Sequence, residues 1–289
     1  LENVINMTLM PMLKKGGSVH YNGSRYHDDD LYGRLLKKGI YNNQHLGNHK
    51  AIQDDNTSLW PELLSYEELL KIKKERGSIA FNAQYQNDTT LMKQGKIFKR
   101  EWFKYFRKEI IGGDTYFIGE GIRVNRKDLK CYQTCDLAKS KKETADYFVI
   151  LTYGIDKQGN IFIFNLYRGR LSWNEQKILV PEHYRQNKPL AWLGIEGTQY
   201  QSVLADEMNI FTDISIKILK AIGDKVSRAM TMSAKFETGK VWIWDNLPHL
   251  GEFEDELTTF PEGEHDDMVD TVGYIPQNSL YERAKVYVN

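Results

Sequence analysis

CYQTCD at residues 131–136, YFVILTY at 147–153 and IFIFNLY at 161–167 are the three segments that decide the fold predicted for this chain. Each has the length and the content of aromatic and β-branched residues that are typical of a strand. The polar residues 156–160 between the last two segments are typical of a tight turn. The three strands are therefore expected to pair as an antiparallel meander.

The pattern then changes to alternating elements. Helices are predicted at residues 173–187 and 199–208, and strands at 190–195 and 214–218. Strands joined through helices are typical of parallel neighbours. An antiparallel meander followed by such alternation is the element order of the ribonuclease H-like fold, an α/β mixed sheet in which the first and fourth strands lie side by side. We expect this fold for the second half of the chain.

Acidic residues occur where this fold would bring them together. Asp136 ends the first predicted strand, Glu196 ends the fourth, and HDDMVD at residues 265–270 opens a predicted helix. Open α/β sheets bind ligands at the carboxyl ends of their strands. Each residue also has a simpler interpretation, as a turn former or a helix cap. Asp270, one turn into the helix, is poorly explained as a cap, so the three sites together indicate a cation site.

Hard oxygen ligands favour Mg²⁺ or Mn²⁺, and two such ions are suited to phosphodiester hydrolysis. The residues predicted to be catalytic are Asp136, as the bridging ligand, Glu196 and Asp267. The principal third ligand stays open among Asp266, Asp267 and Asp270.

Basic residues flank these carboxylates and could contact phosphates without reading base sequence, although any single one is more simply a solvated surface charge. The predicted DNA-binding residues are Lys139, Lys141, Lys142, Lys225 and Arg228.

Composition limits the other classes of protein. With 41% hydrophobic residues in 289, the chain can bury a large core, and its 39 basic and 39 acidic residues cancel. The chain has no apolar run of membrane-spanning length, and its first residues do not resemble a signal peptide. The cysteines, Cys131 and Cys135, lie too far apart along one strand to pair. We expect a soluble chain from a reducing compartment.

The first part of the chain has weaker patterns. A strand is predicted at residues 16–25, a helix start near Asp30, and a helix from about 59 to 77, where Pro61 would sit in the first turn. A smaller, mostly helical segment is expected at residues 1–112, and the nuclease-like domain at 113–289.

Several motifs resemble the nuclease domain of viral large terminases in their order along residues 115–275. They are DLA at 136–138, TADY at 144–147, KVSRA at 225–229, GKV at 239–241 and HDDMVD at 265–270. Upstream, GSRYH at 23–27 and FNAQYQN at 81–87 are similar to the end of the terminase ATPase domain and its linker. No phosphate-binding loop of the form GxxxxGK[ST] occurs. No ATPase activity is expected from this chain alone.

The resemblance implies a Mg²⁺- or Mn²⁺-dependent endonuclease that cuts concatemeric double-stranded DNA during genome packaging, in the host cytoplasm and without a membrane partner. It implies portal protein, small terminase subunit and an ATPase half as partners. Two alternatives stay open. One is a resolvase- or transposase-like nuclease of the same fold, and the other is a non-catalytic DNA-guiding module.

Overall fold

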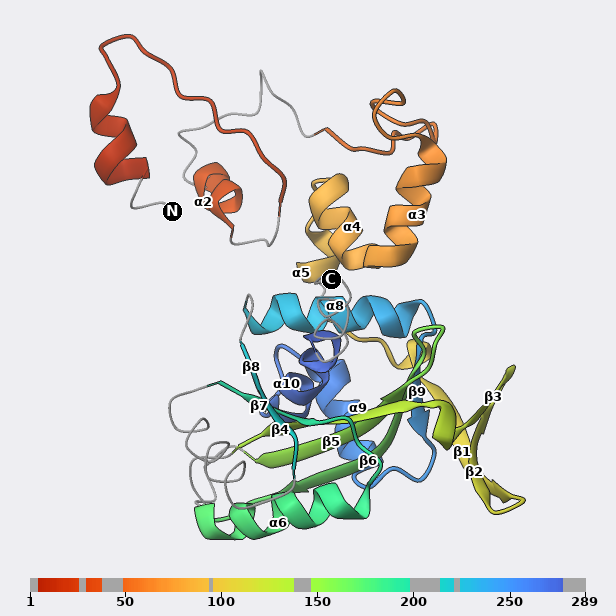
Figure 1. The fold of residues 1–289 in the computed structure, drawn as a ribbon. Coiled ribbons are helices and arrows are strands. Elements are labelled where there is room, and N and C mark those ends of the chain that lie inside the picture. Colours follow the sequence, from red (N-terminus) through yellow and green to blue (C-terminus); the bar gives the residue numbers. More distant parts are fainter. Residues whose placement is uncertain are drawn as a thin grey trace, which may run out of the picture. The chain divides into compact units, whose positions relative to one another are not determined.

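The computed structural model describes residues 5–25, 30–37, 49–93, 96–137, 147–197, 214–220 and 224–277. The chain forms two compact units, Leu1–Gln94 and Gly95–Asn289 (Figure 1). The boundary expected between residues 112 and 113 falls inside the second unit, in the turn between β1 (Lys104–Ile111) and β2 (Asp114–Gly119). Gly112 and Gly113 have φ angles of 61° and 84° there, which suit a hairpin turn.

The first unit is helical. Its elements are η1 (Ile5–Leu9), η2 (Met10–Met12), α2 (Leu31–Lys37), α3 (Tyr66–Arg76), α4 (Ser78–Tyr85) and α5 (Thr90–Lys93). The predicted helix start near Asp30 is confirmed, because Asp30 Oδ1 accepts a hydrogen bond of 2.8 Å from the Gly33 backbone N–H. The strand predicted at residues 16–25 is wrong, since these residues form no strand.

The helix predicted from residue 59 begins later, at Tyr66. A capping box sets this start: Ser65 Oγ accepts from the Glu68 N–H at 3.2 Å, and Glu68 Oε2 accepts from the Ser65 N–H at 2.8 Å. Leu59 and Leu63 precede the helix and are exposed, so their apolar spacing was misleading. Gly77 ends the helix with a positive φ of 79°, as predicted.

The second unit is built on one mixed sheet of nine strands in the order β3-β2-β1-β9-β6-β5-β4-β7-β8. Besides β1 and β2, the strands are β3 (Ile122–Asn125), β4 (Lys130–Asp136), β5 (Phe148–Ile155), β6 (Ile161–Gly169), β7 (Leu193–Glu196), β8 (Ile216–Leu219) and β9 (Val241–Trp244). Two short helical turns, η3 (Arg100–Trp102) and η4 (Arg126–Asp128), flank the first strands.

The ribonuclease H-like order is confirmed. Strands β4, β5 and β6 pair antiparallel, β7 pairs parallel with β4, and β8 pairs parallel with β7. The first and fourth predicted strands are therefore neighbours. The helix predicted at residues 199–208 lies outside the described residues. Four strands, β1–β3 and β9, extend the sheet beyond β6 and were not predicted.

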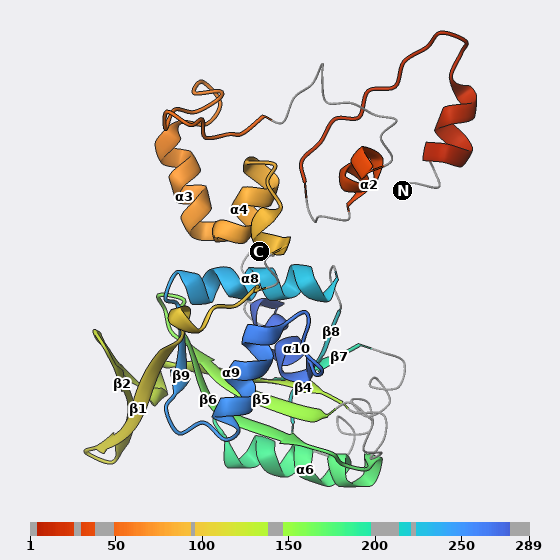
Figure 2. The same cartoon turned by 180° about the vertical axis from the view of Figure 1, so that it is seen from behind.

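Helices cover the two faces of the sheet. Figures 1 and 2 show α8 (Lys225–Glu237), α9 (Leu250–Thr259) and α10 (Asp267–Gly273) on one face and α6 (Trp173–Gln186) on the other. The buried side chains follow this division: Val149 of β5 packs in one core with Met268 of α10, and Ile150 packs in another with Val180 of α6. Successive residues of a strand thus face different helices.

Cys131 and Cys135 are buried free thiols. None of the helices in the described ranges has the length and apolar character needed to cross a membrane.

Candidate metal centre

The parallel pairing of β4 and β7 places Asp136 and Glu196 side by side. Cys135 lies opposite Ile195 in the register, so the next residue of each strand carries a carboxylate at the carboxyl end. Both side chains are half-buried. The sequence-based expectation that the two would be neighbours agrees with this register.

Helix α10 brings further carboxylates to this end of the sheet. Thr134 Oγ1 on β4 donates a hydrogen bond of 2.9 Å to the Thr271 carbonyl oxygen, which fixes the helix against the strand that carries Asp136. Asp267 is buried, and its Oδ2 accepts from the Tyr147 backbone N–H at 3.1 Å. Asp270 lies one turn further along, and only 12% of its side chain is exposed.

The charges of these carboxylates act on one another. The pKa of Asp136 is raised well above its usual value, first by burial and then by the negative charges of Asp270, Glu196 and Asp267, while Lys225 acts in the opposite direction. Asp266 is not among the residues that raise it. Within the described ranges, no three acidic, histidine or cysteine side chains are spaced to enclose one ion as they stand. The group is therefore a concentration of negative charge rather than a closed coordination cage.

Neighbouring side chains hold two of these carboxylates. Tyr274 donates a hydrogen bond of 2.6 Å to Glu196 Oε1, and both burial and this bond raise the pKa of the phenol. Arg228 Nη2 lies 3.0 Å from Asp270 Oδ1, and Lys225 Nζ lies 2.5 Å from Asp270 Oδ2. The pKa of Asp270 is nevertheless raised, because burial outweighs the two cations.

Lys225 and Arg228, which were predicted to contact DNA, contact carboxylates. Lys225 Nζ also lies 2.6 Å from Asp266 Oδ2. Burial alone would lower the pKa of Lys225, but the hydrogen bonds to Asp266 and Asp270 raise it overall. Arg228 is only 10% exposed and stacks 4.9 Å from the centre of the Tyr274 ring. Lys139, Lys141 and Lys142 lie outside the described residues.

Comparison with known proteins identifies the fold. No protein-family model and no curated protein matches the sequence. The structure is similar to the large terminase of a thermophilic bacteriophage, in its crystal form 2, with a TM-score of 0.63 at 10% identity; the match covers 97% of this chain and 66% of that one. The chain has the fold of a large terminase.

Isolated large-terminase nuclease domains match at lower scores. The nuclease of thermophilic phage G20c, in a crystal structure with bound magnesium, gives a TM-score of 0.45 at 17% identity over 62% of this chain and 95% of that chain. The nuclease domain of Thermus phage P74-26 gives 0.40 at 16% identity, over 60% and 89% of the two chains.

Beside the carboxylates lies a basic cluster that the sequence did not reveal. Arg168 and Arg170, at and just beyond the end of β6, lie with their Cζ atoms 3.6 and 4.2 Å from the centre of the Tyr147 ring. Glu256 of α9 is buried with its Oε2 3.8 Å from Arg168, and its Oε1 accepts hydrogen bonds from the Met268 and Val269 backbone N–H groups in the first turn of α10. The sequence offered only a weak signal, an alternation of arginines at the end of a strand.

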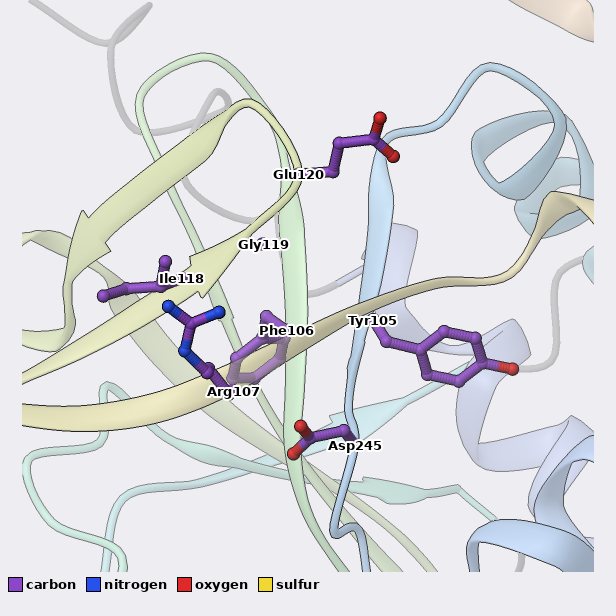
Figure 3. Close-up of a pocket in the computed structure, with 7 residues that line it drawn as sticks. All are labelled: Tyr105, Phe106, Arg107, Ile118, Gly119, Glu120 and Asp245. Carbon is purple, nitrogen blue, oxygen red and sulfur yellow. The ribbon is translucent and has the colours of Figure 1, made fainter.

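A shallow hollow occurs at another part of the large-terminase fold (Figure 3). It is lined by Tyr105, Phe106, Arg107, Ile118, Gly119, Glu120 and Asp245. In the close-up, the carboxylates of Glu120 and Asp245 lie at opposite ends of the hollow. Strands β6 and β5 separate it from Asp136 in the sheet, and it contains none of the predicted site residues.

Proposed function

We propose that this chain is the nuclease part of a viral DNA-packaging terminase, an Mg²⁺- or Mn²⁺-dependent endonuclease that cuts concatemeric double-stranded DNA. One observation carries the proposal: Asp136, Glu196, Asp267 and Asp270 gather at the carboxyl end of a ribonuclease H-like sheet, where burial and then the charges of the other three raise the pKa of Asp136. Carboxylates that repel one another in this way are stabilised by a divalent cation. The fold shared with a large terminase supports the packaging context.

The proposed ligands are Asp136, Glu196, Asp267 and Asp270, with Asp136 shared between two ions. All of their donor atoms are carboxylate oxygens, which suits Mg²⁺ or Mn²⁺ rather than zinc. Asp266 is proposed to stay outside this set, because 44% of its side chain is exposed and it is not among the residues that raise the pKa of Asp136. When bound, the two cations would supply an activated water and stabilise the leaving oxygen of the phosphodiester.

The residues around the ligands would orient them. Tyr274 holds one oxygen of Glu196, the Tyr147 backbone N–H holds one oxygen of Asp267, and Arg228 holds one oxygen of Asp270. Partners of this kind fix the direction of metal-binding carboxylates. Lys225 offsets part of the negative charge and would keep Asp270 in place before cations bind.

Double-stranded DNA is the proposed substrate, with portal protein, small terminase subunit and an ATPase half as further partners in the host cytoplasm. No ATP hydrolysis is proposed for these 289 residues, because they contain no GxxxxGK[ST] loop.

Nicking of supercoiled plasmid tests the proposal. We expect nicking with Mn²⁺ or Mg²⁺, its loss in the presence of chelator, and its loss in Asp136→Asn. Asp255→Asn is a matched control, because it removes a carboxylate of α9 that is 72% exposed. If the parent leaves plasmid intact with both ions while still binding DNA, the chain is a DNA-guiding module instead.

A further inference from the structure

Strand register places Arg168 on the same side of the sheet as the carboxylates. Asp136 lies opposite Val149, and Val149 lies opposite Arg168, so the three residues form one row across β4, β5 and β6. Directly opposite residues of antiparallel strands point to the same face. With strands about 4.8 Å apart, the Cα atoms of Asp136 and Arg168 are separated by roughly 10 Å.

Tyr147 joins this basic pair to the carboxylates. Both guanidinium groups stack on its ring. The ring of His265 packs against it edge-on, with the two ring centres 5.0 Å apart. Its backbone N–H is the group that holds Asp267. The position of the two arginines is thereby coupled to a proposed metal ligand through one residue.

The basic pair is short of negative partners. Among the described residues, Arg168 forms one ion pair, with Glu256 Oε2 at 3.8 Å, and lies near enough to Glu252 to interact with its charge, whereas Arg170 forms no ion pair. The Nε atoms of both arginines are buried without a hydrogen-bond partner in the same part of the chain. Two positive charges on one ring repel each other, and an anion bound between or beside them relieves that repulsion. Arginine that is stacked through its flat face keeps N–H donors at its edge, in the fork that binds phosphate.

We propose that Arg168 and Arg170, stacked on Tyr147, form a binding site for a backbone phosphate of the DNA, within about three nucleotides of the phosphate that is cut. This inference rests on the proposed function. Each strand of duplex DNA carries one phosphate per about 3.4 Å of axis, so a separation of roughly 10 Å corresponds to about three nucleotides. The site would hold the strand in register over the carboxylates without reading bases.

The proposal is tested by measuring how tightly the full chain binds duplex DNA at several salt concentrations. Chelator is present throughout, so that binding is measured without cleavage. Arg170→Gln is expected to weaken binding about fivefold to tenfold and to reduce the slope of log K against log salt by about 0.9, the value for one phosphate contact. Arg185→Gln is the matched control, because it removes an exposed arginine of α6, on the other face of the sheet. It should leave both quantities close to those of the parent.

Two tyrosine variants separate stacking from a general loss of structure. Tyr147→Phe keeps the ring and should bind DNA like the parent, whereas Tyr147→Leu should weaken binding about as much as Arg170→Gln. Equal affinity and equal salt slope for the parent and Arg170→Gln would overturn the phosphate site, and so would a parent that binds no DNA. A parent that binds DNA but cuts none, with Arg170→Gln still weakened, would keep this site and reject the nuclease.

Discussion

At the scale of single residues, Tyr274 is the clearest case of a side chain that acts through another. Its hydroxyl donates a hydrogen bond of 2.6 Å to Glu196 Oε1. Its ring stacks against the guanidinium of Arg228, which in turn donates a hydrogen bond to Asp270 Oδ1. We expect Tyr274→Phe to fold, since the ring remains, and to lower kcat/KM for plasmid nicking about tenfold, a loss typical of removing a partner of a metal ligand. Raising the Mn²⁺ concentration should restore part of the rate. An unchanged metal dependence of nicking would contradict the role assigned to the hydroxyl.

His183 makes the stability of the fold sensitive to acid. Burial lowers the pKa of its imidazole to about 4, and its Nδ1 accepts from Gln133 Nε2 at 3.0 Å, which requires the neutral ring. The unfolded chain takes up this proton near pH 6.5. Stability from this group is therefore complete above about pH 6.5 and is lost as the pH falls toward 4.

Urea unfolding at pH 7.5 and pH 5.0, with chelator present, measures this effect. At pH 5.0 the free energy of unfolding of the parent should be lower by about 2 kcal/mol because of His183. His183→Gln cannot take up this proton. Between pH 7.5 and pH 5.0 its free energy of unfolding should therefore fall by about 2 kcal/mol less than that of the parent, because the two proteins share all other titrating groups. Equal losses in the two proteins would show that His183 does not control this part of the pH profile.

At the scale of elements, a capping box begins helix α6. Ser172 Oγ accepts from the Glu175 N–H at 3.4 Å, and Glu175 Oε2 accepts from the Ser172 N–H at 2.7 Å. Ser172→Ala should lower the free energy of unfolding by about 1 kcal/mol. The nicking rate should not change, since α6 lies on the face away from α10. Ser172→Asp, which can still cap the helix, should recover most of the stability. If Ser172→Asp has the stability of the parent but nicks more slowly, the two faces of the sheet are coupled.

The central elements could be predicted because their sequences carry simple physical signals. Strands β4 and β5 are almost continuously buried and β6 is buried along its first four residues, so their composition alone identifies them. Strand β1 has one buried side chain, Phe106, among charged residues, and its Ile110 is 80% exposed, so no pattern distinguishes it from a loop. Strand β9 has only four residues.

The candidate site divides in the same way. Asp136 and Glu196 were predictable because each ends an apolar strand, and the element order places those strands together. Arg168 and Tyr147 come together through the pairing of Val149 with Arg168 across β5 and β6, a register that neither strand sequence specifies alone. The sequence-based reasoning thus found residues that end a strand and missed those that strand register alone brings together.

At the scale of the whole molecule, the four carboxylates oppose folding in the absence of cations and should favour it in their presence. Asp136 illustrates this, because burial and three neighbouring negative charges raise its pKa. A cation that binds only the folded chain adds about 2.7 kcal/mol at one hundred times its dissociation constant. For a chain of this length, that corresponds to a rise in melting temperature of roughly 5–10 °C.

Thermal unfolding of the full chain with chelator and with Mn²⁺ measures this linkage. The parent should melt at a higher temperature in Mn²⁺. Asp136→Asn should melt above the parent in chelator, because the amide removes one of the repelling charges, and should gain little from Mn²⁺, because a shared ligand is gone. Asp255→Asn, with its carboxylate away from the cluster and paired with Arg100, should keep the full gain. A different result would overturn this account: Asp136→Asn melts below the parent in chelator, and Mn²⁺ raises its melting temperature as much as that of the parent. The cation would then bind elsewhere, and the carboxylates of β4, β7 and α10 would serve only the stability of the fold.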